Sequence, residues 1–261
     1  MIASINQDTG ECKLVSVYRD TYLNLSNDSY NKCNAAYAKG GPEMAISMLN
    51  MNLDMNITDF VTVGFAGLTD TIDALGGVYI DVDDSEISHL NNYQLCIAED
   101  LKRTYTPVSS TGYQLLDGLQ ATGYCRIRYT AGDDFKRAER QREVLAAVAD
   151  QAKKASLPKL TETANSVFNE TYTSLDLTEI IEMLGNVGSY YISDTAGFPQ
   201  ESNRATGTIG SKGSCVIPMN LEDNVKWLHQ FLFNDYEYET SATVKECSEK
   251  IYSDTNGYLK K

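Results

Sequence analysis

The hydrophobic period changes twice between residues 59 and 82, and this change limits the possible fold more than any other feature of the sequence. Residues 59 to 64 alternate toward a strand pattern, and residues 65 to 75 follow the period of an amphipathic helix that Gly76-Gly77 closes. Residues 78 to 82 return to a strand pattern. Because strand, helix and strand follow one another, we predict helices layered on a sheet, which is the α/β class.

The flanking segments predict further strands and helices. Residues 1 to 6 and 13 to 18 alternate around a turn at residues 8 to 11, a pattern typical of a β-hairpin. Pro42 suits the first position of a helix over residues 43 to 52. Further helices are predicted near residues 113–121, 134–155, 157–168, 176–188 and 220–233, and a further strand begins at Tyr190. The apolar stripe of the 134–155 helix is Val144, Leu145 and Val148.

Three stretches lack a regular pattern. Residues 81 to 86 contain an acidic run that we predict to be a solvated loop, because it lacks the glycine and the spaced glutamate of a calcium loop. Residues 83 to 111 are the least regular part of the sequence and are predicted to be a surface insertion. Residues 197 to 214 are rich in Gly, Ser and Thr and indicate a loop. The chain is polar from residue 234 on, so we predict one domain over residues 1–235 and a polar tail over residues 236–261.

The bulk properties exclude some classes of protein. A chain of 261 residues with 42% apolar residues can bury a substantial core, and we expect a monomer. The net charge of −14 argues against general nucleic-acid binding, because no overall positive field would attract a polyanion. No run of about 18 apolar residues occurs, so nothing in the sequence predicts a membrane span. Met1 leads directly into a strand pattern, so we expect an excised domain or a chain missing its front.

Five of the eight arginines lie in one short stretch, against this acidic background. Arg126 and Arg128 are two residues apart on a β-like run, so a period of two places them on one strand face. On the helix that follows, Arg137, Arg140 and Gln141 share one face at i, i+3 and i+4. Guanidinium groups suit phosphate oxygens because several donors are held in one plane. The stretch therefore predicts a binding site for a phosphate-bearing ligand.

The same spacing also fits a solvated helix start that is held by salt bridges. Glu139 and Glu143 can pair with neighbouring arginines at helical spacing. Asp133 or Asp134 can cap the helix. This alternative accounts for Arg142 better than for the two strand arginines, and the spacing alone leaves both interpretations open.

Four blocks of the sequence resemble the LytR–CpsA–Psr family and occur in the same order. The arginine stretch is similar to the end of the family signature, which reads roughly Tyr-x-Arg-x-Arg, a short gap, and Asp-x-x-Arg-x-x-Arg-Gln. Residues 17–21 (Val-Tyr-Arg-Asp-Thr) resemble the Pro-Arg-Asp block, and residues 32–41 resemble the Lys-Ile-Asn-x-Ala-Tyr-x-x-Gly-Gly block. Residues 72–78 resemble the Asp-x-Leu-Gly-Gly-Val block. Together the blocks cover about residues 1 to 152, and four in the right order are specific.

The resemblance implies a fold, an activity and a site. The implied fold is an α-β-α sandwich with a central mixed β-sheet and an apolar tunnel for a polyprenyl chain. The implied activity is a phosphotransferase that moves a glycopolymer from a polyprenyl-pyrophosphate carrier onto peptidoglycan, with fixed arginines stabilising the leaving phosphate. The resemblance assigns to the pyrophosphate pocket Arg19, Arg126, Arg128, Arg137, Arg140 and Gln141. It assigns substrate-binding positions to Lys32, Asn34, Asp20 and Asp134, and Asp134 is expected to orient Arg137.

The family also implies a cofactor and a cellular location. Acidic ligands for Mg²⁺ or Mn²⁺ are expected upstream of Met1, so this piece is expected to bind its ligand but to turn it over weakly. The expected partners are the lipid-linked glycan, peptidoglycan and the membrane surface. The expected location is the extracellular face of a Gram-positive type bacterial membrane, with an anchoring N-terminal transmembrane helix that this sequence does not contain.

Two other functions remain open on the sequence. A non-catalytic binding module for polyprenyl-phosphate lipids or anionic glycans would keep the arginines without turnover. A regulatory protein of the transcriptional-attenuator type is disfavoured by the acidic charge and by the lack of a helix-turn-helix signal.

The six cysteines do not form a Cys-x-x-Cys pair, so a zinc site is not predicted. Buried reduced thiols and disulfides are both consistent with the sequence. Cys33 and Cys125 are the pair that we expect to lie close together, because each adjoins a block that the resemblance places at the same pocket, in a compartment that permits disulfides.

Overall fold

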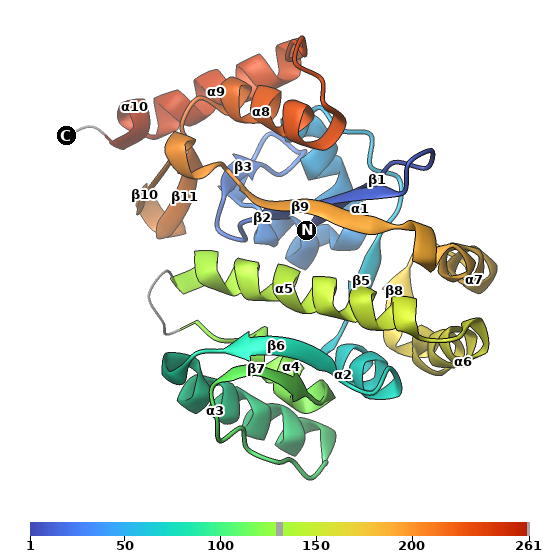
Figure 1. Ribbon diagram of the computed structural model, residues 1–261. Helices are drawn as coiled ribbons and strands as arrows, with labels where there is room; N and C mark the ends of the chain where they lie inside the picture. Colours follow the sequence, from blue (N-terminus) through green and yellow to red (C-terminus); the bar gives the residue numbers. More distant parts are fainter. Residues whose placement is uncertain (129–132, 260–261) are drawn as a thin grey trace. The chain divides into compact units, whose positions relative to one another are not determined.

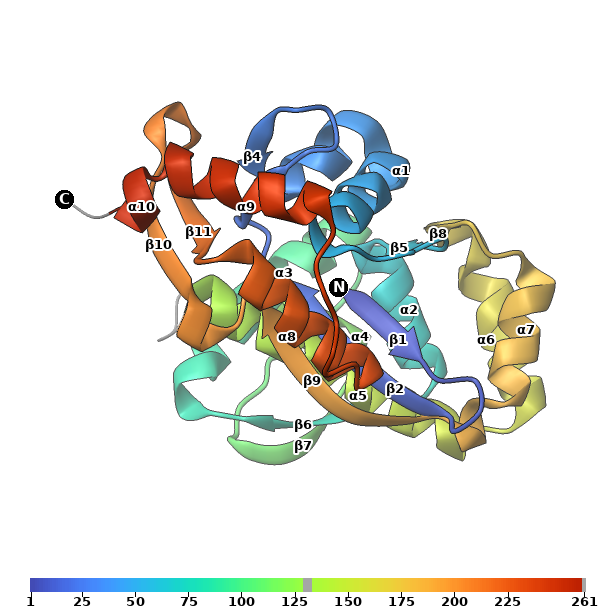
Figure 2. The same ribbon diagram turned by 90° about the horizontal axis from the view of Figure 1, so that it is seen from above.

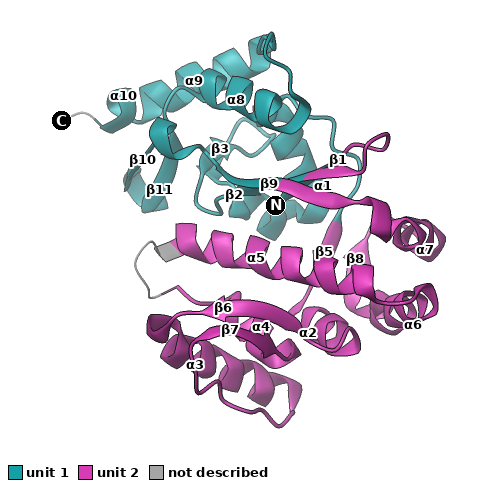
Figure 3. Ribbon diagram, viewed as in Figure 1, with its two compact units in different colours: residues 1–4, 13–60, 194–261 teal, residues 5–12, 61–193 magenta. Residues whose placement is uncertain are grey.

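The computed structural model describes residues 1–128 and 133–259, which form two compact units. Unit 1 contains Met1–Ser4, Lys13–Phe60 and Asp194–Lys261, and unit 2 contains Ile5–Cys12 and Val61–Ser193 (Figure 3). Both units combine helices and strands, so the predicted α/β class is confirmed. Among the described residues, no helix combines the length and the apolar composition needed to cross a bilayer.

Within the described residues, the strands form one three-stranded sheet with the order β1-β2-β9 and four two-stranded sheets (Figure 1). The four pairs are β3-β4, β5-β8, β6-β7 and β10-β11, and each of them is antiparallel. The strand bounds are Ile2–Ile5 (β1), Glu11–Val17 (β2), Tyr22–Asn24 (β3), Tyr30–Lys32 (β4), Val61–Val63 (β5), Val78–Val82 (β6), Gly112–Leu116 (β7), Thr171–Thr173 (β8), Tyr191–Phe198 (β9), Arg204–Thr208 (β10) and Ser214–Pro218 (β11).

Each unit has its own set of helices. Unit 1 has α1 (Asn34–Leu53), α8 (Leu221–Phe233), α9 (Ala242–Asp254) and the short α10 (Asn256–Leu259). Unit 2 has α2 (Phe65–Ala74), α3 (Asp84–Leu101), α4 (Gly118–Tyr124), α5 (Asp133–Lys154), α6 (Leu157–Val167) and α7 (Leu177–Gly185). Short 3₁₀ helices occupy Phe168–Glu170, Val187–Ser189, Glu201–Asn203 and Gly210–Lys212.

Helices α8 and α9 pack side by side in unit 1, and α9 also packs on α1 (Figure 2). The prediction of a polar tail from residue 234 is therefore wrong. Val244, Cys247 and Ile251 are buried in the main core of unit 1, while the residues between them are mostly polar. Their spacing makes a narrow apolar stripe on a helix that Ser241 caps, so the average polarity of this segment concealed an amphipathic helix.

The β6-β7 pair forms the centre of the unit 2 core. Val78, Ile80, Val82 and Leu116 are buried on one face, where the pair contacts α4 and where α5 runs along β6 (Figure 1). The predicted helix over residues 113–121 is wrong in its first half, which is strand β7, and α4 begins only at Gly118. Pairing with a strand about 30 positions earlier in the chain decided this segment, and local periodicity does not report such pairing.

The predicted surface insertion over residues 83–111 contains the 18-residue helix α3. Asp83 and Glu86 form a capping box at its start. The Asp83 side chain accepts a hydrogen bond from the backbone N–H of Glu86, and the Glu86 side chain accepts one from the backbone N–H of Asp83. Leu90, Gln94 and Ile97 are buried at helical spacing. The acidic run that the sequence indicated as a solvated loop is thus the start of a helix.

The predicted loop over residues 197–214 is also wrong. Strand β9 extends to Phe198, and β10 pairs with β11 in the register Arg204–Pro218 to Thr208–Ser214. The small Gly and Thr residues of β10 gave no alternating apolar signal, because the apolar side chains of this hairpin come from β11.

Most other sequence predictions are confirmed, with shifts of a few residues at the ends. Strands β1 and β2 form the predicted hairpin, and the helix of residues 43–52 is the second part of α1, after a break at Gly40-Gly41. Asn220 caps α8 as expected, and α5 covers the predicted 134–155 helix. Leu145 is an exception, since it is 40% exposed whereas Val144 is buried. The predicted strand at Arg126 and Arg128 is wrong, as described below.

Candidate functional site

Arg126 and Arg128 do not lie on a strand. Helix α4 ends at Tyr124, and the backbone N–H groups of Arg126 and Ile127 donate to the carbonyls of Gly123 and Tyr124, at 3.0 and 3.3 Å. These local turns use the backbone groups that strand pairing would need. Ile127 is fully buried between the two arginines, so the alternation of buried and exposed side chains holds without a sheet.

Arg126 is held by two aromatic rings. Its guanidinium carbon lies 4.5 Å from the ring centroid of Phe65 and 5.2 Å from that of Tyr93. Each such contact contributes about 0.5–1 kcal/mol at an exposed site and more where water is excluded. The rings fix the position of the guanidinium, whose N–H groups point outward in its own plane, and this arrangement suits an anion.

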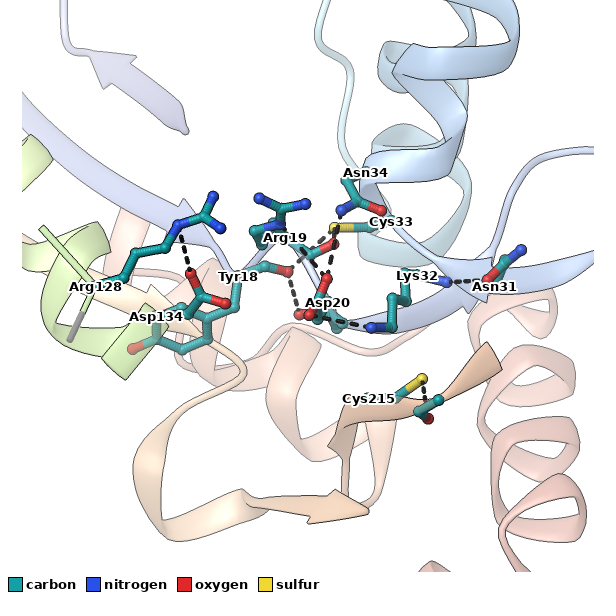
Figure 4. Close-up of polar contacts among 12 residues, drawn as sticks. Tyr18, Arg19, Asp20, Asn31, Lys32, Cys33, Asn34, Arg128, Asp134 and Cys215 are labelled. Atoms are coloured by element: carbon teal, nitrogen blue, oxygen red, sulfur yellow. Dashed lines mark hydrogen bonds and ion pairs between the residues drawn. The ribbon is translucent and has the colours of Figure 1, made fainter. Parts of the chain in front are cut away.

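Asp134 brings two further arginines together. Its Oδ1 lies 3.8 Å from Arg128 Nε and 3.6 Å from Arg137 Nη1 (Figure 4 shows the first contact). The Arg128 side chain is 38% exposed and that of Arg137 is 20% exposed. One carboxylate therefore orients two guanidinium groups that still reach solvent.

Arg140 was predicted to share a phosphate-facing surface with Arg137, and this prediction is wrong. Arg140 is 1% exposed, and its Nε donates to Glu86 Oε1 at 2.7 Å. Its Nη1 donates to the carbonyl of Ile127 at 3.3 Å. Gln141 also points inward, where its Nε2 donates to the carbonyl of Cys125 at 3.5 Å. Both side chains thus tie α5 to the segment that carries Arg126 and Arg128.

The alternative of a salt-bridged helix start is correct only in part. Glu139 pairs with Lys136 at 2.9 Å, and Glu143 accepts a hydrogen bond from the hydroxyl of Tyr124 at 2.8 Å. Asp134 of the same helix pairs with Arg128 and Arg137, and Arg142 is 8% exposed. The ion pairs at the start of α5 therefore include those of Asp134 with the two arginines and that of Glu139 with Lys136.

Unit 1 holds the second predicted group of polar residues, around Asp20. Its carboxylate contacts Lys32 Nζ at 3.2 Å, Asn34 Nδ2 at 3.4 Å and Arg19 Nε at 3.6 Å (Figure 4). The backbone N–H of Asn34 donates to the carbonyl of Arg19 at 3.1 Å, and that of Cys33 to Thr21 at 2.8 Å. The structure thus brings Arg19, Asp20, Lys32 and Asn34 together, as predicted, with Arg19 44% exposed.

Arg204 is a neighbour of this group that the sequence did not indicate. Its Nη1 donates a hydrogen bond to Tyr18 Oη at 3.2 Å, and its guanidinium carbon lies 5.1 Å from the centroid of the Tyr18 ring. It belongs to β10, in the segment that was predicted to be a loop. An isolated arginine in a Gly-, Ser- and Thr-rich stretch gives no signal of this contact.

The acids of these two groups do not fit a divalent cation. Within residues 1–128 and 133–259, no cluster of three His, Cys, Asp or Glu side chains could hold a metal ion. Asp20 is already bonded to Lys32 and Asn34, and Asp134 lies between two arginines. Hard cations need carboxylate oxygens that are not neutralised by neighbouring cationic side chains. Asp20 and Asp134 are therefore not suited to bind the Mg²⁺ or Mn²⁺ ion that the resemblance implies, and this ion stays a prediction.

All six cysteines are free thiols, so the predicted pairing of Cys33 with Cys125 is wrong. Each of the two belongs to a different hydrophobic cluster. Cys33 Sγ donates to the carbonyls of Tyr18 and Arg19, at 3.1 and 3.3 Å. Burial raises the pKa of both thiols to about 12. Their role is to fill the core beside the polar blocks.

Cys96 is the exposed cysteine, and alkylation should distinguish it from the others. With a maleimide at pH 7 the folded protein should take up one label, at Cys96, because burial raises the pKa of thiols such as Cys33 and so keeps the reactive thiolate scarce. In urea, without a reducing agent, six labels should appear. Mass spectrometry of the intact protein counts them, and four labels in urea would show a disulfide.

An apolar pocket of about 290 Å³ lies in unit 2 beside α6 and α7, lined by residues such as Val61, Phe168, Ile180 and Leu184. Its lining contains no arginine and no other charged side chain. The pocket shows that unit 2 offers apolar space, but it does not adjoin the described contacts of Arg126 or Arg128. The tunnel that the resemblance implied stays a prediction.

Comparison with known proteins finds relatives that are named for cell-wall assembly. It is 34% identical over 148 residues to the "Probable cell wall biosynthesis protein LcpB" of Corynebacterium glutamicum, which covers 55% of this chain and 31% of that protein. It is 31% identical over 186 residues to the "Polyisoprenyl-teichoic acid--peptidoglycan teichoic acid transferase TagV" of Bacillus subtilis, which covers 69% of this chain and 45% of that protein. The chain thus spans less than half the length of these two relatives.

A solved structure and a family model agree with these relatives. The fold is similar to that of the "LytR-CPS2A-psr family protein YwtF (TagT) with bound octaprenyl pyrophosphate lipid", with a TM-score of 0.60 and 20% identity over 97% of this chain and 82% of that one. The model of the LytR_cpsA_psr family matches residues 1–209, which include every residue of both polar groups. Because this match covers most of the sequence, the chain belongs to the LytR–CpsA–Psr family.

Proposed function

We propose that the protein is a phosphotransferase that moves a glycopolymer from a polyprenyl-pyrophosphate carrier onto peptidoglycan. The observation that carries this proposal is the group of Arg128, Asp134 and Arg137, in which one carboxylate orients two solvent-reaching guanidinium groups. Two planar donors at one place suit the oxygens of a pyrophosphate. Arg126, fixed between two rings, adds a third guanidinium from the same segment.

The comparisons support the ligand class. The relative TagV is named as a transferase of teichoic acid from a polyisoprenyl carrier to peptidoglycan, and the similar TagT structure contains an octaprenyl pyrophosphate. A polyprenyl pyrophosphate combines a strongly anionic head with an apolar tail. The head matches the arginines, and the tail requires an apolar cavity in the same protein.

The chemistry gives the arginines a role beyond binding. In the proposed reaction, an acceptor hydroxyl forms a bond to the phosphorus that carries the glycan, and the bond from this phosphorus to the polyprenyl phosphate breaks. Negative charge grows on the departing polyprenyl phosphate. Guanidinium groups that are already held in place stabilise this charge without reorganisation, as oriented donors do in other phosphoryl transfers.

Arg128→Ala and Arg137→Ala are each expected to weaken the binding of a short-chain polyprenyl pyrophosphate by about tenfold to a hundredfold. Each variant removes one charged hydrogen-bonding group, worth about 1.5–3 kcal/mol. Isothermal titration calorimetry at fixed ionic strength measures the loss. Asp134→Asn is expected to give a smaller loss, because it removes the group that orients the arginines and leaves their charges in place.

Arg103→Ala is the matched control for Arg128→Ala. Its side chain is 37% exposed and pairs with Asp70, whereas Arg128 is 38% exposed and pairs with Asp134. Arg142 is unsuitable as a control because its burial would make the alanine variant destabilising. Equal losses of affinity in Arg103→Ala and Arg128→Ala would mean that general charge attracts the ligand, and would remove the support for this site.

Turnover separates the transferase from a non-catalytic binding module. Binding of the lipid is expected to persist in EDTA, because guanidinium groups supply the contacts that we propose. Cleavage of the pyrophosphate lipid by this chain is expected to be weak, since Asp20 and Asp134 are bonded to cationic side chains. Release of polyprenyl phosphate with and without added Mg²⁺ or Mn²⁺ tests the cofactor. Tight binding without turnover under either condition would favour the binding module.

The remaining parts of the proposal concern the setting of the reaction. We propose a peptidoglycan acceptor, a monomeric protein, and a place at the extracellular face of a bacterial membrane. Mass spectrometry of lipid extracted from the purified protein would identify the carrier that it binds. Sedimentation analysis would measure its oligomeric state.

A further inference from the structure

A second pocket in unit 2 is lined by the β6-β7 pair, by the start of α3 and by α5, and its lining includes none of Arg128, Asp134 and Arg137. Its volume is about 500 Å³, which is within the range of about 300–1,000 Å³ for ligand pockets. One wall is a face of α5, where Glu143, Ala147, Asp150 and Lys154 recur at i, i+4, i+7 and i+11. Ala147 is the small residue of this row, and it also packs against the core cluster that contains Ile80.

The other wall carries two stacked tyrosines. The rings of Tyr79 and Tyr113 have centroids 5.3 Å apart and an interplanar angle of 20°, and they are 43% and 74% exposed as residues. Asp81 lies opposite Tyr113 in the register, so all three side chains project from the same face of the strand pair. The opposite face is buried. A solvent-facing side of an antiparallel pair is usually polar, so this exposed aromatic surface points to a ligand.

Polar groups of the pocket are available for hydrogen bonds. The side chains of Asp81, Gln151 and Lys154 make no hydrogen bond or ion pair with any other residue that the structure describes. Deeper in the pocket, Tyr124 donates to Glu143 at 2.8 Å, and burial raises the pKa of Tyr124, so this hydroxyl stays protonated. The Tyr124–Glu143 hydrogen bond therefore fixes the bottom of the pocket. At the rim, the Asp81 carboxylate can accept hydrogen bonds, the Lys154 ammonium can donate them, and the Gln151 amide can do both.

The charge of the lining selects among ligands. It contains five carboxylates, of Asp81, Asp83, Glu86, Glu143 and Asp150, and two lysines, Lys136 and Lys154. Such a surface repels a polyanion, so the pocket does not suit the phosphates of the proposed carrier. The lining also contains hydrogen-bond donors, of Gln151 and Lys154, which can bind uncharged acceptor groups.

We propose that this pocket binds a neutral saccharide. The C–H face of a pyranose ring is apolar and can pack on the exposed faces of Tyr79 and Tyr113. Its hydroxyl groups both donate and accept, which matches the carboxylate of Asp81 and the Gln151 and Lys154 side chains at the rim. The lining contains no member of the Arg128 group, so this inference does not depend on the activity proposed above.

Titration of the purified protein with chitotetraose and with maltotetraose tests the proposal. At least one of these neutral oligosaccharides should bind saturably. Tyr113→Ala should weaken that binding at least about tenfold, because it removes the more exposed ring of the stacked pair. Tyr113→Trp should retain the binding, since an aromatic face remains. Tyr236→Ala is the matched control, because Tyr236 is also 74% exposed but lies in unit 1, and it should leave binding unchanged.

Three outcomes would overturn the proposal. The first is that neither oligosaccharide binds to the folded protein. The second is that Tyr113→Ala and Tyr236→Ala lose binding equally. The third is that oligolysine or inorganic pyrophosphate displaces the bound sugar, since either would show that the pocket recognises charge rather than a saccharide. Circular dichroism of each variant confirms that it is folded.

Discussion

Glu86→Ala is expected to lower the free energy of unfolding by about 3–5 kcal/mol, because it leaves the buried Arg140 guanidinium without its carboxylate. Glu86 is 4% exposed and Arg140 is 1% exposed, and their Oε1 and Nε atoms lie 2.7 Å apart. Glu86 Oε2 also accepts a hydrogen bond from the backbone N–H of Asp83 at 3.0 Å. The substitution thus uncaps α3 and removes the carboxylate next to a buried guanidinium. Urea denaturation followed by far-UV circular dichroism measures the loss.

Glu139→Ala is the control for this prediction. Glu139 also pairs with a cationic side chain, Lys136 at 2.9 Å, but both side chains are more than 40% exposed. Surface pairs of this kind contribute about 0–1 kcal/mol, so the control should be nearly as stable as the parent protein. The double variant Glu86→Leu, Arg140→Met should be more stable than Glu86→Ala, because no buried charge remains unpaired. Equal stability losses at positions 86 and 139 would contradict the structure of this pair.

Ending the chain at residue 235 is expected to abolish cooperative folding of unit 1. The deletion removes α9, whose residues Val244, Cys247 and Ile251 are at most 2% exposed in the core. The substitution Ile251→Ala alone should cost about 2–5 kcal/mol, as large-to-small changes in a core do. Trp227 packs on the same cluster and is the sole tryptophan of the sequence, so its fluorescence reports on unit 1 during denaturation.

Tyr252→Ala tests whether the effect comes from the buried stripe of α9. Tyr252 follows Ile251 directly on the same helix, but it is 55% exposed. Its replacement should cost less than about 1 kcal/mol, since surface substitutions usually lie within about 0.5 kcal/mol. A chain ending at residue 235 that unfolds with the parent's midpoint would show that α9 is dispensable, and the prediction of a polar tail would then stand.

The sequence predicted those elements whose signals are local. The α1 segment after Gly40-Gly41, the hairpin of β1 and β2, and α8 with its Asn220 cap each have a turn residue, a cap or a strong apolar period. It failed where the partner is distant or the stripe is narrow. Strand β7 depends on pairing with β6, and α9 shows three buried apolar residues among polar ones.

The candidate site shows the same division. The sequence identified the residues that gather around Asp20 and Asp134, because their types and spacing suit phosphate oxygens. It could not show that Arg137 reaches solvent while Arg140 is buried, since their spacing places both on one side of a helix. The separation depends on Glu86, more than 50 positions earlier in the chain, which draws Arg140 into the core. Burial of a charge is a tertiary property, and no local pattern reports it.

Helix α5 acts as a rigid spacer inside unit 2. It carries Arg137 in its first turns and Asp150 of the tyrosine-lined pocket near its end, and thirteen residues at about 1.5 Å per residue separate them by about 20 Å along the axis. A single ligand can contact both Arg137 and Asp150 only if it is at least this long. A monosaccharide beside Asp150 and inorganic pyrophosphate at Arg137 should therefore bind without touching each other, whereas an extended lipid-linked glycan could show avidity, with an affinity above that of either part.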